Sequence, residues 1–199
     1  HHVAPLNSYM IDIIFDEPFL YLLMVGINSR YVRVEPLKTD VEEDDVANYS
    51  KDATTYISAL TRIYQDIEKK SPGVLGIKGD GEKSFNSDLA KQFYKGRISF
   101  TPVIAKDNHR QLAILDRIVR TLRDMAYRVR PGTLTPELMK HVVDQYNRAP
   151  HNRLSEIMGF HCTPEMVENT PALEREIIQR TRVLNDEKMR QPDYQLLPG

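Results

Sequence analysis

The chain has 199 residues, of which 41% are hydrophobic and 28% charged, and its formal net charge is −1. These values are close to those of globular proteins, so they exclude a disordered or fibrous chain, and the length suits one α/β domain with extensions. The single cysteine, Cys162, excludes an internal disulfide and a cysteine-rich zinc site, and no apolar run approaches the roughly 20 residues that span a bilayer.

The first predicted elements are three strands. Residues 9–15, 20–27 and 31–37 are apolar or alternate in polarity, and the polar breaks Glu17-Pro18 and Asn28-Ser29 predict turns between them. Short turns join antiparallel strands, so we expect a three-stranded antiparallel opening that ends at Pro36.

An acidic stretch follows, with six acids against one lysine over residues 40–52, and it is typical of a solvated loop. Apolar residues recur at helical spacing over residues 53–69, which predicts a helix that Ser71-Pro72-Gly73 breaks. The next predictions are a strand over residues 74–78, a turn at Gly79-Asp80-Gly81, a helix capped by Asn86 that runs to about Phe93, and a strand over residues 97–103.

The longest helical pattern runs from residue 108 to about residue 128. One polar face lies beside its apolar stripe and contains Asp116, Arg120, Arg123 and Tyr127. Residues 106–130 contain seven bases against three acids. A phosphate backbone would therefore be attracted to this segment and repelled by the acidic loop.

Three more helices are predicted, from Thr135-Pro136 to Tyr146, from Thr163-Pro164 onwards, and from Ala172 to about Arg190. Strands followed by alternating strands and helices predict an α/β fold, with a mixed five-stranded sheet flanked by helices. The predicted organisation is a tag remnant or leader over residues 1–8, a catalytic core over 9–169 and a C-terminal helical extension over 170–199.

Three aspartates lie at positions that favour a functional role for their carboxylates. Asp12 lies inside an apolar strand, where its charge is costly unless it is paired, hydrogen-bonded or bound to a metal. Asp80 ends a later strand, where open α/β sheets present ligand-binding groups, and Asp116 lies on the long helix. Carboxylates from separate elements are what two-metal phosphoryl transfer requires, and hard oxygen ligands favour two Mg²⁺ or Mn²⁺ ions.

These segments resemble, in order, the catalytic core of retroviral integrases and transposases. The landmarks are the YMIDIIFD strand, the GDGEKSF turn, the NHRQLAILDRIVRTLRD helix and the late DQYNRAPHNRLSEIMGFHCTPEMV segment. The resemblance covers about residues 9–167, and the 35 residues between Asp80 and Asp116 match the family's interval. The late segment is most similar to integrases of retrotransposons and of Maverick or Polinton elements. The resemblance implies a ribonuclease-H-like fold in which Asp12, Asp80 and Asp116 are the catalytic and metal-holding residues.

Three features depart from the family pattern. The third acid is Asp116 where the family usually has Glu, and Asp80-Gly81-Glu82 stands where it often has Asp-Asn-Gly. Asp12 and Asp80 are 68 positions apart, more than in compact retroviral cores, and the acidic loop after Lys38 accounts for the excess. Glu82 is either an accessory metal ligand or an exposed turn residue.

The resemblance also implies contacts with DNA, because Arg120 and Arg123 match basic positions on the family's active-site helix. The candidate DNA-binding residues are Lys106, Asn108, His109, Arg117, Arg120 and Arg123. Solubilisation of the helix is the alternative role for them. The expected partners are element-end and target double-stranded DNA and further copies of the chain, as a homodimer or higher multimer, in the nucleus or in an intracellular nucleoprotein complex; no membrane partner is expected.

The predicted function is therefore metal-dependent processing of DNA 3′ ends followed by strand transfer. Two alternatives stay open: a domesticated, non-catalytic domain that binds DNA or protein, and a ribonuclease-H-like nuclease that only hydrolyses nucleic acid. Asn147 and His151 are expected to fix a local turn by hydrogen bonds, and Cys162 to be a buried small residue.

Overall fold

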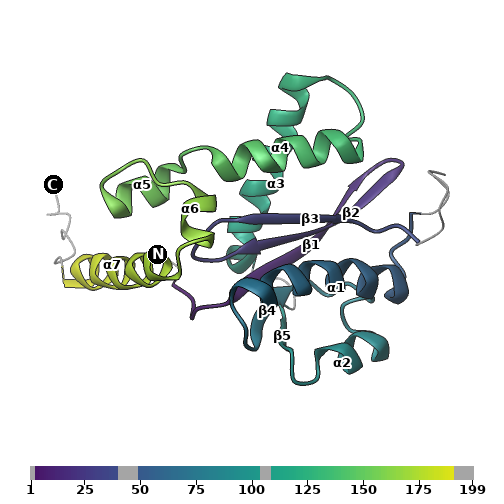
Figure 1. The fold of residues 1–199 in the computed structure, drawn as a ribbon, viewed down its shortest axis with the longest axis horizontal. Coiled ribbons are helices and arrows are strands. Elements are labelled where there is room, and N and C mark those ends of the chain that lie inside the picture. The colour runs from purple at the N-terminus through teal and green to yellow at the C-terminus, as the bar shows by residue number, and fades with distance from the viewer. Residues whose placement is uncertain (1–2, 40–48, 104–108, 191–199) are drawn as a thin grey trace, which may run out of the picture.

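The computed structural model describes the backbone of residues 3–39, 49–103 and 109–190, and the side chains of these residues except 109–111 and 188–190. In chain order the elements are β1 (Ser8–Asp16), β2 (Phe19–Gly26), β3 (Val32–Pro36), α1 (Ala53–Lys70), β4 (Leu75–Gly79), α2 (Asp88–Tyr94), β5 (Ile98–Pro102), α3 (His109–Val129), α4 (Pro136–Arg148), α5 (Asn152–Met158), α6 (Pro164–Glu168) and α7 (Pro171–Arg190). Figure 1 shows their arrangement. Most of the predicted acidic loop lies outside the described residues.

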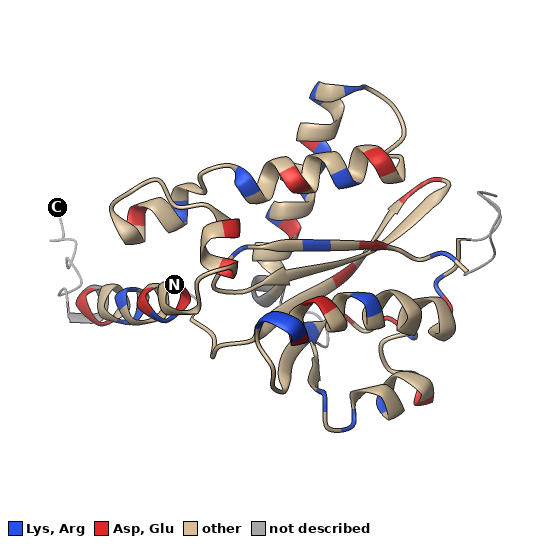
Figure 2. Cartoon of the chain, viewed as in Figure 1, with Lys and Arg blue, Asp and Glu red and all other residues tan. Residues whose placement is uncertain are grey.

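The sheet has five strands in the order β3-β2-β1-β4-β5. β2 runs antiparallel to β1 and β3, whereas β4 runs parallel to both β1 and β5. The mixed sheet and its antiparallel opening are therefore confirmed. The helices carry most of the charged segments and the strands are mostly uncharged (Figure 2), as expected for a sheet that is covered on both faces.

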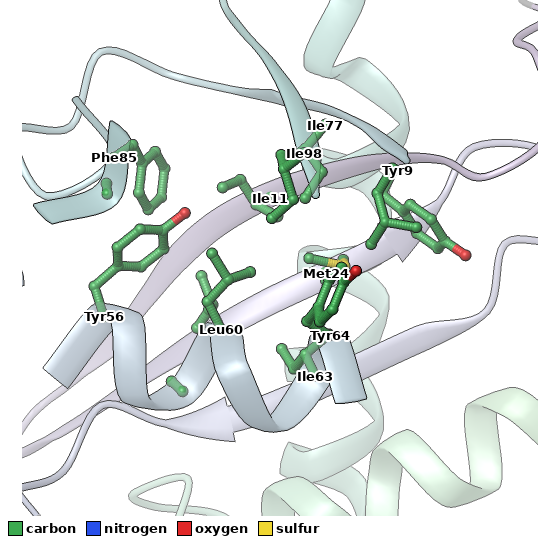
Figure 3. Close-up of a cluster of buried hydrophobic side chains, with 14 of the residues drawn as sticks. Tyr9, Ile11, Met24, Tyr56, Leu60, Ile63, Tyr64, Ile77, Phe85 and Ile98 are labelled. Carbon is green, nitrogen blue, oxygen red and sulfur yellow. The ribbon is translucent and has the colours of Figure 1, made fainter. Parts of the chain in front are cut away.

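The two faces of the sheet bury two separate cores, because successive side chains of a strand point to opposite faces. Tyr9, Ile11 and Ile13 of β1 pack with α1 and α2, and Figure 3 shows Leu60, Ile63 and Tyr64 of α1 facing the strands in this core. Met10 and Ile14 of β1 instead pack with α3 and α4. Asp12 lies between Met10 and Ile14 in the same alternation along β1, so its side chain points to the same face of the sheet, which α3 covers.

The first core contains a chain of polar contacts close to the end of β4. The hydroxyls of Tyr56 and Tyr94 are 2.7 Å apart, and the Tyr94 hydroxyl donates to the Phe85 carbonyl at 3.0 Å. The Tyr56 and Phe85 rings are also in contact, with centroids 4.9 Å apart (Figure 3). These contacts hold the segment after β4 against α1 and α2, and therefore help to position the turn that contains Asp80.

The structure differs from the sequence prediction at several helix boundaries. α5 was not predicted; the His151 side chain caps it, with Nδ1 accepting from Leu154 N at 3.4 Å. Asn147 does not fix a local turn, because its amide bonds to both the N–H and the carbonyl of Val32 in β3, each at 2.9 Å. Ser87 rather than Asn86 caps α2, since its hydroxyl is the group that accepts from Ala90 N.

α5, α6 and α7 share a third small core that includes Cys162, which is fully buried as expected. Ile177 of α7 is also buried in this core. Within the part of the chain that the structure describes, no helix combines the length and apolar character needed to cross a bilayer.

Candidate functional site

Asp12 lies in the centre of the sheet with its carboxylate on the face that α3 covers. Its Oδ1 accepts a hydrogen bond from Ile13 N at 2.8 Å. Burial raises the pKa of Asp12 to about 6, the charges of Asp80, Asp116 and Glu82 add to the rise, and the Ile13 N–H opposes it. Repulsion by three other carboxylates shows that all four side chains share one electrostatic neighbourhood.

The pairing of β1 with β4 brings Asp80 to Asp12. The partners run from Ser8 and Gly76 to Ile11 and Gly79, a constant difference of 68 in residue number. The same difference separates Asp12 from Asp80, so the two aspartates follow the last paired residues of adjacent parallel strands. The long interval in the sequence is therefore the register offset of β1 and β4, with α1 and the acidic stretch in the connection between them.

Gly79 allows β4 to approach its neighbours closely where it ends. A Cβ at this position would lie 2.9 Å from Ile11 Cγ1 and 3.1 Å from Phe85 Cδ2. Both distances are shorter than ordinary van der Waals contact, so a larger residue would displace the end of the strand. Gly79 therefore contributes to the position of the Asp80 backbone.

Asp80 begins a tight turn in which its Oδ1 accepts from Glu82 N at 3.1 Å. Burial raises the pKa of Asp80; the Glu82 charge acts in the same direction, whereas the Glu82 N–H and Lys51 lower it. Lys51 Nζ also lies 3.4 Å from Glu82 Oε1. Lys51 is a cation at the site that the sequence analysis did not identify, because it precedes α1 and is distant from Asp80 in the sequence.

Asp116 reaches the same region from α3. The helix packs against β1 and buries Leu115, Ile118 and Leu122 in the second core, while Asp116 itself is exposed. Its charge contributes to the raised pKa of Asp12. A strand, a strand end and a helix thus each contribute one of the three predicted acids.

Asp12 is half-buried, and the charges of Asp80, Glu82 and Asp116 all act on it in the same direction, which raises its pKa. Within the described ranges, no three histidine, cysteine or acidic side chains form a ready-made metal-binding group. The donors nevertheless fit a hard divalent cation, because they are all carboxylate oxygens and their mutual repulsion already contributes to the raised pKa of Asp12. Asp12, Asp80 and Asp116 are the residues that could hold it.

The predicted DNA-binding residues divide into three groups. Lys106 and Asn108 lie outside the described residues, as does the side chain of His109. Arg120 and Arg123 are on the solvent side of α3, and Arg123 Nη2 donates to the Phe15 carbonyl at 3.0 Å, so it also ties α3 to β1.

Arg117 forms the third group and lies on the other flank of α3, away from Asp116. It lines a pocket of about 410 Å³ together with Arg30 and Arg153. This pocket could not be predicted from the sequence, because its arginines come from segments that are distant in the chain and match no motif.

No protein-family model and no curated protein matches the sequence. Among solved structures, the fold is similar to a chain in the cryo-EM structure of the simian T-cell lymphotropic virus intasome in complex with PP2A regulatory subunit B56 gamma. The TM-score is 0.64 at 14% sequence identity, and the match covers 85% of this chain. It covers 56% of that chain, so the present chain spans little more than half of its length. At this identity the likeness shows the fold alone.

Proposed function

We propose that this chain is the catalytic core of an integrase-type enzyme that cuts and joins DNA, built on a ribonuclease-H-like fold. The strand order, the helices on both faces and the likeness to an intasome chain support the fold. The observation that supports the function is the register of β1 and β4, which brings Asp12 and Asp80 to adjacent strands, together with the contribution of Asp116 to the raised pKa of Asp12.

The proposed reaction has two steps. Water first hydrolyses a phosphodiester near the end of a DNA element and releases a 3′-hydroxyl. That hydroxyl then attacks a phosphodiester of target DNA, which breaks the target strand and forms a new bond between the two DNAs. Both steps are phosphoryl transfers, so one set of carboxylates can serve both.

The chain's own residues hold the acids ready for a divalent cation. The Ile13 and Glu82 N–H groups orient one carboxylate oxygen each on Asp12 and Asp80. Two Mg²⁺ or Mn²⁺ ions, when bound, would supply activation of the attacking oxygen and neutralisation of the departing one. Asp116 is one methylene shorter than Glu, so we propose that the packing of α3 against β1 compensates for the shorter reach.

The proposed partners are double-stranded DNA, from both the element end and the target, and further copies of this chain. The likeness to a chain of an intasome is compatible with both. Such an activity would place the protein in the nucleus or in another intracellular nucleoprotein complex.

A strand-transfer assay tests the proposal. A DNA duplex with a recessed 3′ end is incubated with plasmid target and Mg²⁺ or Mn²⁺, and joined product is quantified for the wild type and for Asp80→Asn. We expect the substitution to reduce joining to background, a loss of about a hundred-fold or more, with little change in Tm, because Asn keeps the side-chain volume and loses the charge that the cation requires.

Asp116→Asn and Asp124→Asn form a matched pair on α3, since both residues are exposed on the same helix and only Asp116 acts on Asp12. Only the first should abolish joining. Full joining by Asp80→Asn with Mn²⁺ would refute the assigned role. Hydrolysis of DNA without joined product would instead identify a nuclease. If neither hydrolysis nor joining is seen, and calorimetry detects no heat of Mg²⁺ binding, the chain is a non-catalytic domain.

A further inference from the structure

A second polar site lies on the opposite flank of α3 from the carboxylates. It is the pocket of about 410 Å³ between α3, the turn after β2 and the junction of α4 with α5. Its apolar lining includes Ile114, Ile118 and Met125 of α3. Its charged lining consists of Arg30, Arg117 and Arg153, and none of its lining residues is acidic.

Three side chains that line this pocket have a buried polar atom without a partner. They are Arg30 Nη1, Arg153 Nη2 and the Tyr146 hydroxyl, out of five such atoms in the described part of the chain. Buried donors are satisfied in the great majority of cases, so three in one pocket indicate a missing acceptor. Arg153 Nη1 donates to Glu156 Oε2 at 3.1 Å, whereas Arg153 Nη2 has no hydrogen-bond partner.

Of the three arginines of the pocket, Arg153 has a carboxylate partner in Glu156, and the three guanidinium charges affect one another. Burial lowers the pKa of Arg30 to about 10, Tyr146 opposes that effect, and Arg153 and Arg117 lower the pKa further. Burial and the Arg30 charge lower the pKa of His151 to about 4, so the imidazole is neutral at about pH 7. Burial raises the pKa of Tyr146 to about 12, so its hydroxyl keeps its proton and can donate. An anion would relieve the mutual repulsion of the three guanidinium groups.

We propose that this pocket binds a phosphate group of a nucleic-acid backbone. The arginine guanidinium groups and the tyrosine hydroxyl can donate hydrogen bonds to a phosphate group, which has several acceptor oxygens. The choice of a nucleic acid rests on the proposed function, since the acids and the pocket lie on opposite flanks of one helix. The exposed Arg120 and Arg128 lie on the solvent side of that helix.

The dimensions of α3 agree with a single duplex that contacts both places. A helix with its side chains is about 10–12 Å across. That width corresponds to about three base pairs of B-DNA at about 3.4 Å each. One phosphate of a duplex can therefore lie at the carboxylates while another, a few nucleotides along, enters the arginine pocket.

The first experiment measures binding of inorganic phosphate to the full chain without divalent metal. Tm is followed against phosphate concentration, with chloride as the control at equal ionic strength. We expect phosphate to raise Tm of the wild type and of Lys91→Gln, an exposed control on α2, and to raise it at most half as much for Arg30→Gln or Arg153→Gln. In chloride, Arg30→Gln should itself raise Tm, because it removes a partly buried charge whose Nη1 has no hydrogen-bond partner.

The second experiment measures duplex binding by fluorescence anisotropy at several salt concentrations in EDTA. Loss of one phosphate contact lowers the slope of log affinity against log salt by about 0.9. For the double variant Arg30→Gln/Arg153→Gln we expect a slope reduced by about 1 and an affinity about ten-fold weaker, with Lys91→Gln unchanged.

The outcomes separate this proposal from the proposed enzymatic function. No phosphate-specific rise in Tm would overturn the pocket as an anion site. A rise in Tm with unchanged duplex affinity and slope would overturn the nucleic-acid assignment, and displacement of phosphate by an acidic peptide would then identify a carboxylate ligand. Both experiments omit metal and catalysis, so a chain that joins no DNA can still pass them.

Discussion

Replacement of Asp12 by asparagine should stabilise the fold at neutral pH in the absence of metal. At about 1.36 kcal/mol per pKa unit, a rise from 3.8 to about 6 corresponds to about 3 kcal/mol. The pKa is higher in the folded than in the unfolded chain, so the folded chain holds the proton more tightly and loses stability as pH rises from about 4 to about 6. An asparagine side chain at this position carries no charge at any pH, and its amide oxygen can still accept from Ile13 N.

Urea unfolding of the wild type and Asp12→Asn in EDTA, at about pH 3.5 and about pH 7.5, measures this effect. We expect the variant to exceed the wild type by about 1–3 kcal/mol at the higher pH and to match it at the lower pH, where Asp12 is largely protonated in both states. The range allows for partial exposure of Asp12. Asp124→Asn is the control and should show no pH-dependent gain. A variant that is less stable at the higher pH, or a difference that does not change with pH, would refute the electrostatic argument.

Three further predictions concern the same structure. Saturating Mg²⁺ should raise the unfolding free energy of the wild type by about 1.4 kcal/mol for each ten-fold excess over Kd, and it should raise that of Asp12→Asn much less. An equal gain for both proteins, measured by urea unfolding, would exclude Asp12 as a ligand. Gly79→Ala should cost about 1–3 kcal/mol and also reduce strand transfer, because the methyl group would meet Ile11; a variant with unchanged urea midpoint and activity would show that the chain has room there. Asn147→Ala should cost about 2 kcal/mol through loss of two buried hydrogen bonds to Val32, with faster amide exchange at Val32 as the local readout, and normal exchange there would contradict the contact.

The sheet was predictable because each strand has its own periodicity and each break contains turn residues. The order of the strands is not a local property of the sequence, so it was not predicted beyond the antiparallel opening, and it required the structure. α5 was missed because it has only seven residues and is capped by a histidine, which is not among the usual capping side chains. Ser87 was overlooked for the opposite reason, since both it and its neighbour Asn86 are good caps and the sequence does not choose between them.

The candidate site was predictable in its residue types more than in its geometry. Asp12 in an apolar strand and Asp80 at a strand end are visible in the sequence, but their adjacency depends on the register of β1 and β4. The arginine pocket was not predictable, because Arg30 stands in a turn with a φ of 61° and Arg153 in an unpredicted helix. The charge of Arg117 was enough to predict a contact with DNA, whereas the face of α3 on which Arg117 lies could be determined only from the structure.

The double hydrogen bond from Asn147 to Val32 also affects how copies of this chain can associate. Val32 lies on β3, an outer strand whose free N–H and carbonyl groups would otherwise invite a strand from a second molecule. The amide occupies one such pair of groups and α4 packs alongside the strand. Continuous sheet extension across β3 is thereby blocked at Val32, so copies of this chain cannot associate by adding a strand along the whole of this edge.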